Sequence, residues 1–192
     1  MESTQTFKQR QLSNKKKLGA LSLEAIAVIA FIAFLITGSL YAMNIMFRDG
    51  RINDAMTNLQ LINTKVNELY SYSPDFTGLD AEKLIHSGNA PSGMVNSSRD
   101  GLRSYWGVLR LGPASSDGGT NNTFSVTFEN VPSEVCQKLG IIIAGSGTPW
   151  QSLDIDGSLH DSIDNQDDNI VDFLFENCVG KSNEMTFIAK AQ

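Results

Sequence analysis

Residues 15–47 read KKKLGALSLEAIAVIAFIAFLITGSLYAMNIMF, and this stretch decides how the rest of the chain is interpreted. Three lysines precede an apolar run, residues 21–47, which at roughly 1.5 Å per helical residue is long enough to cross a bilayer. Glu24 is the one charge inside this run. A carboxylate at bilayer depth costs roughly 2.5–3.5 kcal/mol on insertion scales, and less near the interface. We therefore expect Glu24 to be functional and to meet a cationic partner.

Two other interpretations of the apolar run stay open. A plain single-pass anchor explains the length and the lysines, but it does not explain Glu24. A cleaved secretory signal has a shorter apolar core with small residues at its far end, a place that Ala42 could fill. The basic start fits the positive-inside rule, with the N-terminus in the cytoplasm.

Residues 19–24, GALSLE, resemble the processing site of type IV prepilins. In that family a basic leader ends in Gly, a dedicated peptidase cuts after it, the new N-terminus is N-methylated, and Glu is the fifth mature residue. The resemblance implies cleavage between Gly19 and Ala20, N-methylation of Ala20, and an assembly role for Glu24. Ala20 stands where the family often has Phe, and the leader is longer than in type IVa members. Both departures favour the type IVb class, which includes bundle-forming and thin pili.

The resemblance also implies a mechanism and a set of partners. Residues 20–47 would hold the precursor in the bacterial inner membrane until the prepilin peptidase removes the leader. The new amine on Ala20, cationic near neutral pH, would pair with Glu24 of a neighbouring subunit and set the register of a helical homopolymer. Large apolar side chains would then pack in a central helical bundle, with small alanines allowing close approach. The inner-membrane pilus assembly machinery is the further expected partner, and an extracellular pilus the final location.

The pattern divides the chain into four parts. Residues 1–19 are the leader, 20–47 the membrane and filament-core helix, 48–72 its amphipathic continuation, and 73–192 a globular head. In the third part apolar residues recur at 3-4-3-4-3 spacing, which predicts one buried stripe on a polar helix. The residues of this stripe are Ile52, Ala55, Leu59, Ile62, Val66 and Leu69. Two separate helices, broken near Asp49-Gly50, are the alternative.

The head is predicted to be an antiparallel sheet against which the long N-terminal helix packs, an α+β fold. We expect a short helix near 80–87 capped by Asp80, and a helix at 133–139 capped by Ser133. We expect strands at 106–111, ended by Gly112-Pro113, and at 124–128, 141–144, 153–155 and 185–189. Residues 105–114, YWGVLRLGPA, are similar to an aromatic-Gly strand motif of type IVb pilins. The order that follows also matches that family, which implies a variable surface region bounded by the cysteines, residues 136–178.

Cys136 and Cys178 lie in the part expected outside the cytoplasm. An even pair in an oxidising compartment suggests a disulfide, which in the chain-entropy treatment of a loop of about 43 residues contributes on the order of 4 kcal/mol. Two buried free thiols are the alternative.

Composition limits the remaining functions. Residues 1–19 carry a net charge of +4, which leaves −10 on the rest of a chain whose formal charge is −6, so a broad nucleic-acid-binding face is not expected. His86 and His160 belong to no recognisable catalytic or metal-binding motif, so we expect no enzyme activity and no cofactor. Asp154 and Asp156 open an acidic segment that resembles part of a calcium loop, although a solvated acidic surface explains it as well.

The sequence thus predicts a structural subunit of a type IVb-like pilus that serves adhesion, bundling or conjugative contact. A minor pilin or a type II secretion pseudopilin would share the leader and the helix. A membrane-anchored periplasmic binding or enzymatic domain is the alternative of a different class, and the lack of a catalytic motif and the presence of Glu24 count against it.

Overall fold

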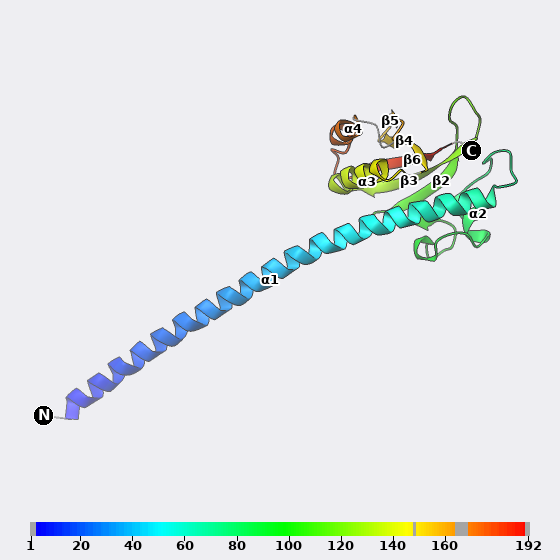
Figure 1. The fold of residues 1–192 in the computed structure, drawn as a ribbon. Helices are drawn as coiled ribbons and strands as arrows, with labels where there is room; N and C mark the ends of the chain where they lie inside the picture. The colour runs from blue at the N-terminus through cyan, green and yellow to red at the C-terminus, as the bar shows by residue number, and fades with distance from the viewer. Residues whose placement is uncertain (1–2, 148, 164–168, 191–192) are drawn as a thin grey trace. The chain divides into compact units, whose positions relative to one another are not determined.

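The structure is a computed structural model that describes residues 3–147, 149–163 and 169–190, without the side chains of 3–24 and 40–48 (Figure 1). The chain divides into two compact units, Met1–Phe47 and Arg48–Gln192. Every buried core residue that the structure describes belongs to the second unit. Residues 48–192 therefore have a hydrophobic core of their own, as an independently folding domain does.

One helix, α1 (Ser3–Leu69), runs through both units. The prediction of a continuous helix is confirmed, and the alternative break near Asp49-Gly50 is wrong because both residues are helical. Within the second unit the predicted stripe is buried from Ile52 to Val66, and Leu69 is partly buried against the same core. The polar residues between these positions are exposed or partly exposed, so this half of α1 packs mainly with one face.

Six antiparallel strands form one sheet within the described residues, in the order β1-β2-β3-β6-β4-β5. The strands are β1 (Leu102–Arg103), β2 (Val108–Ala114), β3 (Thr123–Val131), β4 (Trp150–Ile155), β5 (Ser158–Asp161) and β6 (Asn183–Ala189). The last strand, β6, lies between β3 and β4 and pairs with both. The head is therefore α+β, as predicted, with its C-terminal strand in the middle of the sheet.

Aromatic rings link Tyr70, the residue after α1, to the sheet. Neighbouring ring centroids in this series lie 5.3–6.1 Å apart and the rings are tilted or edge-to-face, the arrangement that aromatic pairs prefer. The series comprises Tyr70, Phe76, Phe124, Trp150, Phe187, Phe128 and Trp106. Because Phe124, Trp150, Phe187 and Phe128 are almost fully buried, this aromatic series forms the centre of the core.

Two helices of the head agree only in part with the prediction from the sequence. Helix α2 (Ala81–His86) begins as predicted, with the Lys83 N–H donating to the Asp80 carboxylate at 2.6 Å. Helix α3 (Ser133–Gly145) is longer than predicted, and a strand at 141–144 is wrong because those residues continue the helix. Ser133 does not cap α3; the residue at the cap position is Pro132. The buried side of α3 recurs at helical spacing: Val135, Cys136, Leu139, Gly140, Ile143 and Ala144.

Three further elements were not predicted: β1, β5 and α4 (Ile170–Asn177). A short 3-10 helix, η1 (Ser92–Met94), precedes β1. Strand β2 does not end at Gly112-Pro113 but continues to Ala114. Because β1 pairs only with Val108 and Leu109, β2 is an edge strand at Pro113, where a missing backbone N–H is tolerated.

Candidate functional site

The first unit presents an apolar helix surface, residues 25–39, in which every side chain is exposed. Large apolar residues occur all around this segment, with exposed fractions from 48% to 75%. They are Ile26, Val28, Ile29, Phe31, Ile32, Phe34, Leu35 and Ile36. The two hydroxyl groups of this segment form hydrogen bonds with the helix backbone. Thr37 donates to the Ala33 carbonyl at 2.7 Å, and Ser39 donates to the Ile36 carbonyl at 2.9 Å. The segment therefore offers its surroundings almost no polar side chain, which suits contact with lipid or with other helices.

The predicted processing and assembly residues lie on α1 just before this surface. Gly19, Ala20 and Glu24 are within the helix, but their side chains lie outside the described part of the structure. Cleavage after Gly19, methylation of Ala20 and pairing by Glu24 therefore stay predictions.

Among the residues whose side chains the structure describes, no helical segment combines the length and the apolar character needed to span a bilayer. The predicted membrane helix, residues 20–47, includes two segments, 20–24 and 40–47, whose side chains lie outside that description.

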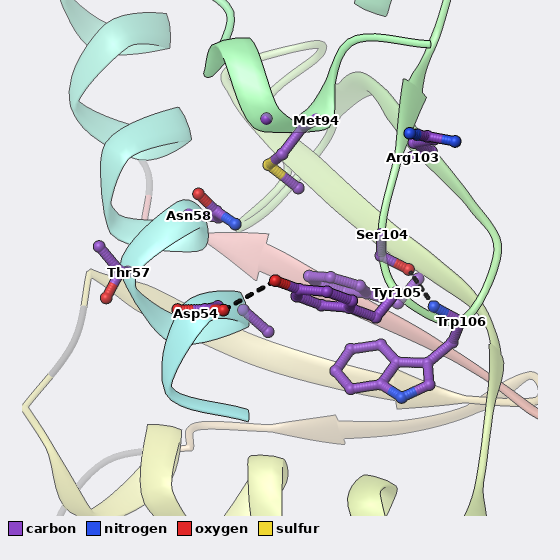
Figure 2. A pocket seen from close by; sticks show the side chains of 11 residues that line it. Asp54, Thr57, Asn58, Met94, Arg103, Ser104, Tyr105 and Trp106 are labelled. Atoms are coloured by element: carbon purple, nitrogen blue, oxygen red, sulfur yellow. Dashed lines mark hydrogen bonds between the residues drawn. The ribbon is translucent and has the colours of Figure 1, made fainter. Parts of the chain in front are cut away.

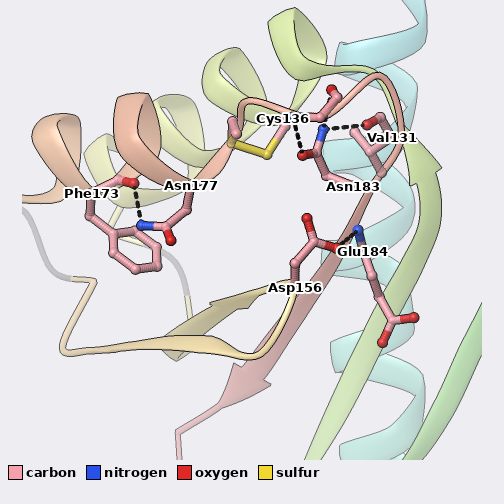
Figure 3. Close-up of a disulfide and its surroundings, with 9 residues drawn as sticks. Val131, Cys136, Asp156, Phe173, Asn177, Asn183 and Glu184 are labelled. Atoms are coloured by element: carbon pink, nitrogen blue, oxygen red, sulfur yellow. Dashed lines mark hydrogen bonds between the residues drawn. A yellow bond between two sulfur atoms is a disulfide. The ribbon is translucent and has the colours of Figure 1, made fainter.

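The predicted disulfide is present, and it joins the two helices of the bounded region, residues 136–178 (Figure 3). Cys136 lies on α3 and Cys178 caps the C-terminus of α4, with their Cα atoms 5.8 Å apart and both side chains buried. Helices α3 and α4 also pack directly, because a Cβ atom built on Gly140 would overlap the buried Leu174 side chain. The disulfide therefore stabilises a contact that is already close.

Asn183 is the first residue of β6, and its side chain forms hydrogen bonds at this end of the strand (Figure 3). Its side chain is 1% exposed, donates to the carbonyls of Val131 at 2.9 Å and Gly180 at 3.1 Å, and accepts from the Gly180 N–H at 3.1 Å. A buried amide with its hydrogen bonds made fixes the start of β6 rather than destabilising it.

The two calcium candidates form a hairpin turn instead of a cluster. Asp156 and Gly157 connect β4 to β5, both with positive φ (51° and 88°), which is the Asp-Gly turn favoured in two-residue hairpins. The Asp154 carboxylate accepts from the Gly157 N–H at 2.9 Å, and the Asp156 carboxylate accepts from the Glu184 N–H at 2.8 Å. Among the described residues no group of three or more His, Cys, Asp or Glu is placed to hold a metal ion. The other acidic residues of this segment at 164, 167 and 168 lie outside the description.

The two histidines lie on separate parts of the head. His86, on the exposed face of α2, is 4.0 Å from Glu82 one turn earlier. The His160 ring, on β5, lies 4.7 Å from the ring of Phe173 on α4.

A cavity of about 450 Å³, here called the polar pocket, opens between α1 and the segment 103–106 (Figure 2). Asp54, Thr57 and Asn58 come from α1, while Arg103, Ser104, Tyr105 and Trp106 come from the other side, with Met94 and Phe128 buried behind them. These residues were not predicted as a site, although Tyr105 and Trp106 of the aromatic-Gly motif line it.

Tyr105 and Asp54 join the two sides of the polar pocket. The Tyr105 hydroxyl donates to Asp54 Oδ2 at 2.8 Å (Figure 2), and this hydrogen bond, together with the negative charge of Asp54, raises the pKa of Tyr105 above its usual value. The Arg51 guanidinium lies 5.6 Å from the centre of the Tyr105 ring, a cation–π distance. Gly107 is needed beside them, because an added Cβ would lie 2.8 Å from Asn130 Nδ2 and 3.1 Å from the Glu129 carbonyl oxygen.

Comparisons with known proteins identify this architecture. A crystal structure of a type IVb pilin from Salmonella typhi is 21% identical, and the match covers 68% of this chain and 94% of that one with a TM-score of 0.51. The crystal structure of TcpA, a type IV pilin from Vibrio cholerae El Tor biotype, is 11% identical, and the match covers 73% of this chain and 99% of that one with a TM-score of 0.52. A search of curated proteins returned no match.

The fold is thus that of the type IVb pilins, as the sequence resemblance implies. The chain belongs to the PilS N-terminal family, which matches residues 50–190.

Proposed function

We propose that this chain is the structural subunit of a type IVb-like pilus, made as a precursor and polymerised into an extracellular filament for adhesion, bundling or conjugative contact. In this proposal residues 1–19 are a leader that a prepilin peptidase removes after Gly19, and Ala20 becomes the N-methylated N-terminus. Before assembly, residues 20–47 lie in the inner membrane. The role is structural, without catalysis.

The apolar helix surface, residues 25–39, is the observation that carries the proposal. An isolated helix with large apolar side chains exposed on all sides is unfavourable in water, because each buried CH₂ would contribute about 0.8 kcal/mol. Lipid before assembly and neighbouring copies of α1 afterwards both cover such a surface. The alanines at 25, 27, 30 and 33 allow helices to approach closely.

Glu24 provides register in this proposal. Apolar packing is tolerant of sliding along the helix axis, whereas a charged pair is satisfied at one position only. The amine of Ala20 on an incoming subunit would pair with Glu24 of its neighbour, which offsets the cost of a carboxylate in an apolar setting. The prepilin peptidase and the inner-membrane assembly machinery are the partners that this sequence of events requires.

The experiment is intact-mass and N-terminal analysis of the protein from cells with and without a prepilin peptidase. We expect a chain that begins at methylated Ala20 only when the peptidase is present. A Gly19→Asp variant is the matched control and should keep its leader in both cell types. A wild-type chain that still begins at Met1 in the presence of the peptidase, or that is cut near Ala42, would refute the proposal.

A further inference from the structure

The polar pocket has hydrogen-bonding groups that the fold itself does not use. The side chains of Asn58 and Arg103 have no hydrogen bond or ion pair within the described part of the protein. Asp54 uses one carboxylate oxygen, Oδ2, for Tyr105 and leaves Oδ1 for another donor. Thr57 donates to the Asn53 carbonyl at 3.0 Å, so its oxygen can still accept. Donors and acceptors from α1 and from the segment 103–106 thus line the same cavity.

The same cavity has aromatic and apolar surface beside these polar groups. Tyr105 is 57% exposed, and Trp106 is held by an edge-to-face contact with the buried Phe128 at 6.0 Å. The buried Met94 thioether lies on the side of η1. Phe128 supports the Trp106 ring and the hydrogen bond to Asp54 holds Tyr105, so a ligand would meet a preformed wall and lose little free energy to ordering it.

These features together select the chemistry of a ligand. The cavity volume of about 450 Å³ is that of a small-molecule site, which typically spans about 300–1,000 Å³. A purely apolar ligand would leave Asn58, Arg103 and the Oδ1 atom of Asp54 desolvated without partners. An anion would meet the Asp54 carboxylate, while a cation would meet the Arg103 guanidinium and the Arg51 guanidinium beside Tyr105, so each charged ligand would face a like charge. A neutral, hydroxyl-rich ring with an apolar C–H face fits both kinds of surface.

We propose that the polar pocket binds a neutral pyranose unit of a glycan. Asn58 and Asp54 hydrogen-bond to neighbouring hydroxyl groups of the sugar from α1, and Arg103 donates to a third oxygen from the opposite side. The C–H face of the ring packs on the aromatic side chains of Tyr105 and Trp106. This site goes beyond filament formation, because it belongs to the second unit and needs no neighbouring subunit.

The test is a titration of the purified full-length chain in a detergent that has no sugar headgroup. The probes are the methyl glycosides of glucose, galactose and mannose, and N-acetylglucosamine. The readout is tryptophan fluorescence. Because the chain has two tryptophans and Trp150 is 1% exposed in the core, a response reports on Trp106. We expect at least one probe to give a saturable change at millimolar concentration.

Matched variants on α1 assign the site. Asn58→Ala should weaken binding about five- to tenfold, the effect of one lost hydrogen bond, and Arg103→Ala should do the same. Gln60→Ala removes an exposed amide of the same helix outside the pocket and should bind as the wild type does. Circular dichroism confirms that each variant is folded. The proposal is overturned if no probe binds at millimolar concentration, or if Asn58→Ala and Gln60→Ala bind equally well.

Discussion

Replacing Gly140 by alanine tests whether α3 and α4 pack as closely as the structure indicates. An added Cβ would lie 2.9 Å from Leu174 Cδ1 and 3.2 Å from Leu174 Cγ, and it would overlap Leu174 Cδ2 outright. Leu174 is 0% exposed, so its side chain has to move within the core to make room for the added Cβ. The disulfide at the end of α4 also restrains α4 from moving away.

Two opposing effects set the magnitude. Inserting a methyl group into a filled core costs about 1–3 kcal/mol, and the restraint on Leu174 places this site at the upper end. Replacing glycine by alanine within a helix stabilises the helix by about 0.8–1.0 kcal/mol, because alanine has the higher helix propensity. We therefore expect Gly140→Ala to lower the free energy of unfolding by about 1–2 kcal/mol.

The assay is urea denaturation of residues 48–192, the unit that contains the whole described core. The expected result is a lower midpoint at an unchanged m value, since the surface exposed on unfolding is the same. Gly145→Ala is the matched control on the same helix, because nothing lies within 4 Å of its added Cβ. The control should be unchanged or more stable by at most about 1 kcal/mol. If Gly140→Ala were as stable as Gly145→Ala, the close α3–α4 contact would be refuted.

Three further predictions concern the disulfide, the pocket and assembly. Replacing Cys136 and Cys178 by serine should lower the free energy of unfolding of residues 48–192 by about 4 kcal/mol in the chain-entropy treatment, and an unchanged urea midpoint would show that the disulfide is dispensable. Asp54→Asn should return the raised pKa of Tyr105 toward its usual value, and tyrosinate absorbance measures this pKa. In the wild type, the stabilisation by the Tyr105–Asp54 hydrogen bond is complete below about pH 10 and is lost as the pH rises through the raised pKa of Tyr105. Titration identical to the wild type would contradict that assignment. Glu24→Ala should give processed subunits but no filaments, as judged by mass analysis and by electron microscopy of sheared material; abundant filaments without a wild-type copy would exclude the register role.

Elements with a strong local pattern were predictable from the sequence. The stripe from Ile52 to Val66 follows helical spacing. Strand β3 contains the alternating residues 124–128, and β6 contains the predicted strand 185–189. The disulfide was predictable because the chain has one pair of cysteines in a part expected outside the cytoplasm.

Elements that depend on tertiary contacts were missed. Three consecutive isoleucines, 141–143, favour a strand by propensity, but only Ile143 is buried, and α3 continues because its buried side extends from Val135 to Ala144. Helix α4 buries only Ile170 and Leu174 within its length, which is too short a pattern to indicate a helix without α3 beside it.

The Asp156-Gly157 turn and the polar pocket show what could not be inferred from the sequence alone. Asp156-Gly157 belongs to the segment that we interpret as a solvated acidic surface or part of a calcium loop, although the same dipeptide is a hairpin signal that would have predicted β5. The polar pocket could not be predicted, because Asp54 and Tyr105 are far apart in the sequence and meet only when α1 packs beside the segment before β2. The spacing of residues within a short segment does not show that two distant segments contact each other.

The position of β6 has a consequence for how this protein is made. The strands that lie on either side of β6, β3 and β4, are synthesised before it, and neither has its full set of partners until β6 has also been made. A chain that ends before Asn183 would keep two unpaired strand edges, which are templates for aggregation. Insertion of β6 between β3 and β4 is therefore the step that closes both edges, and the sheet is complete only when residues 183–189 are in place.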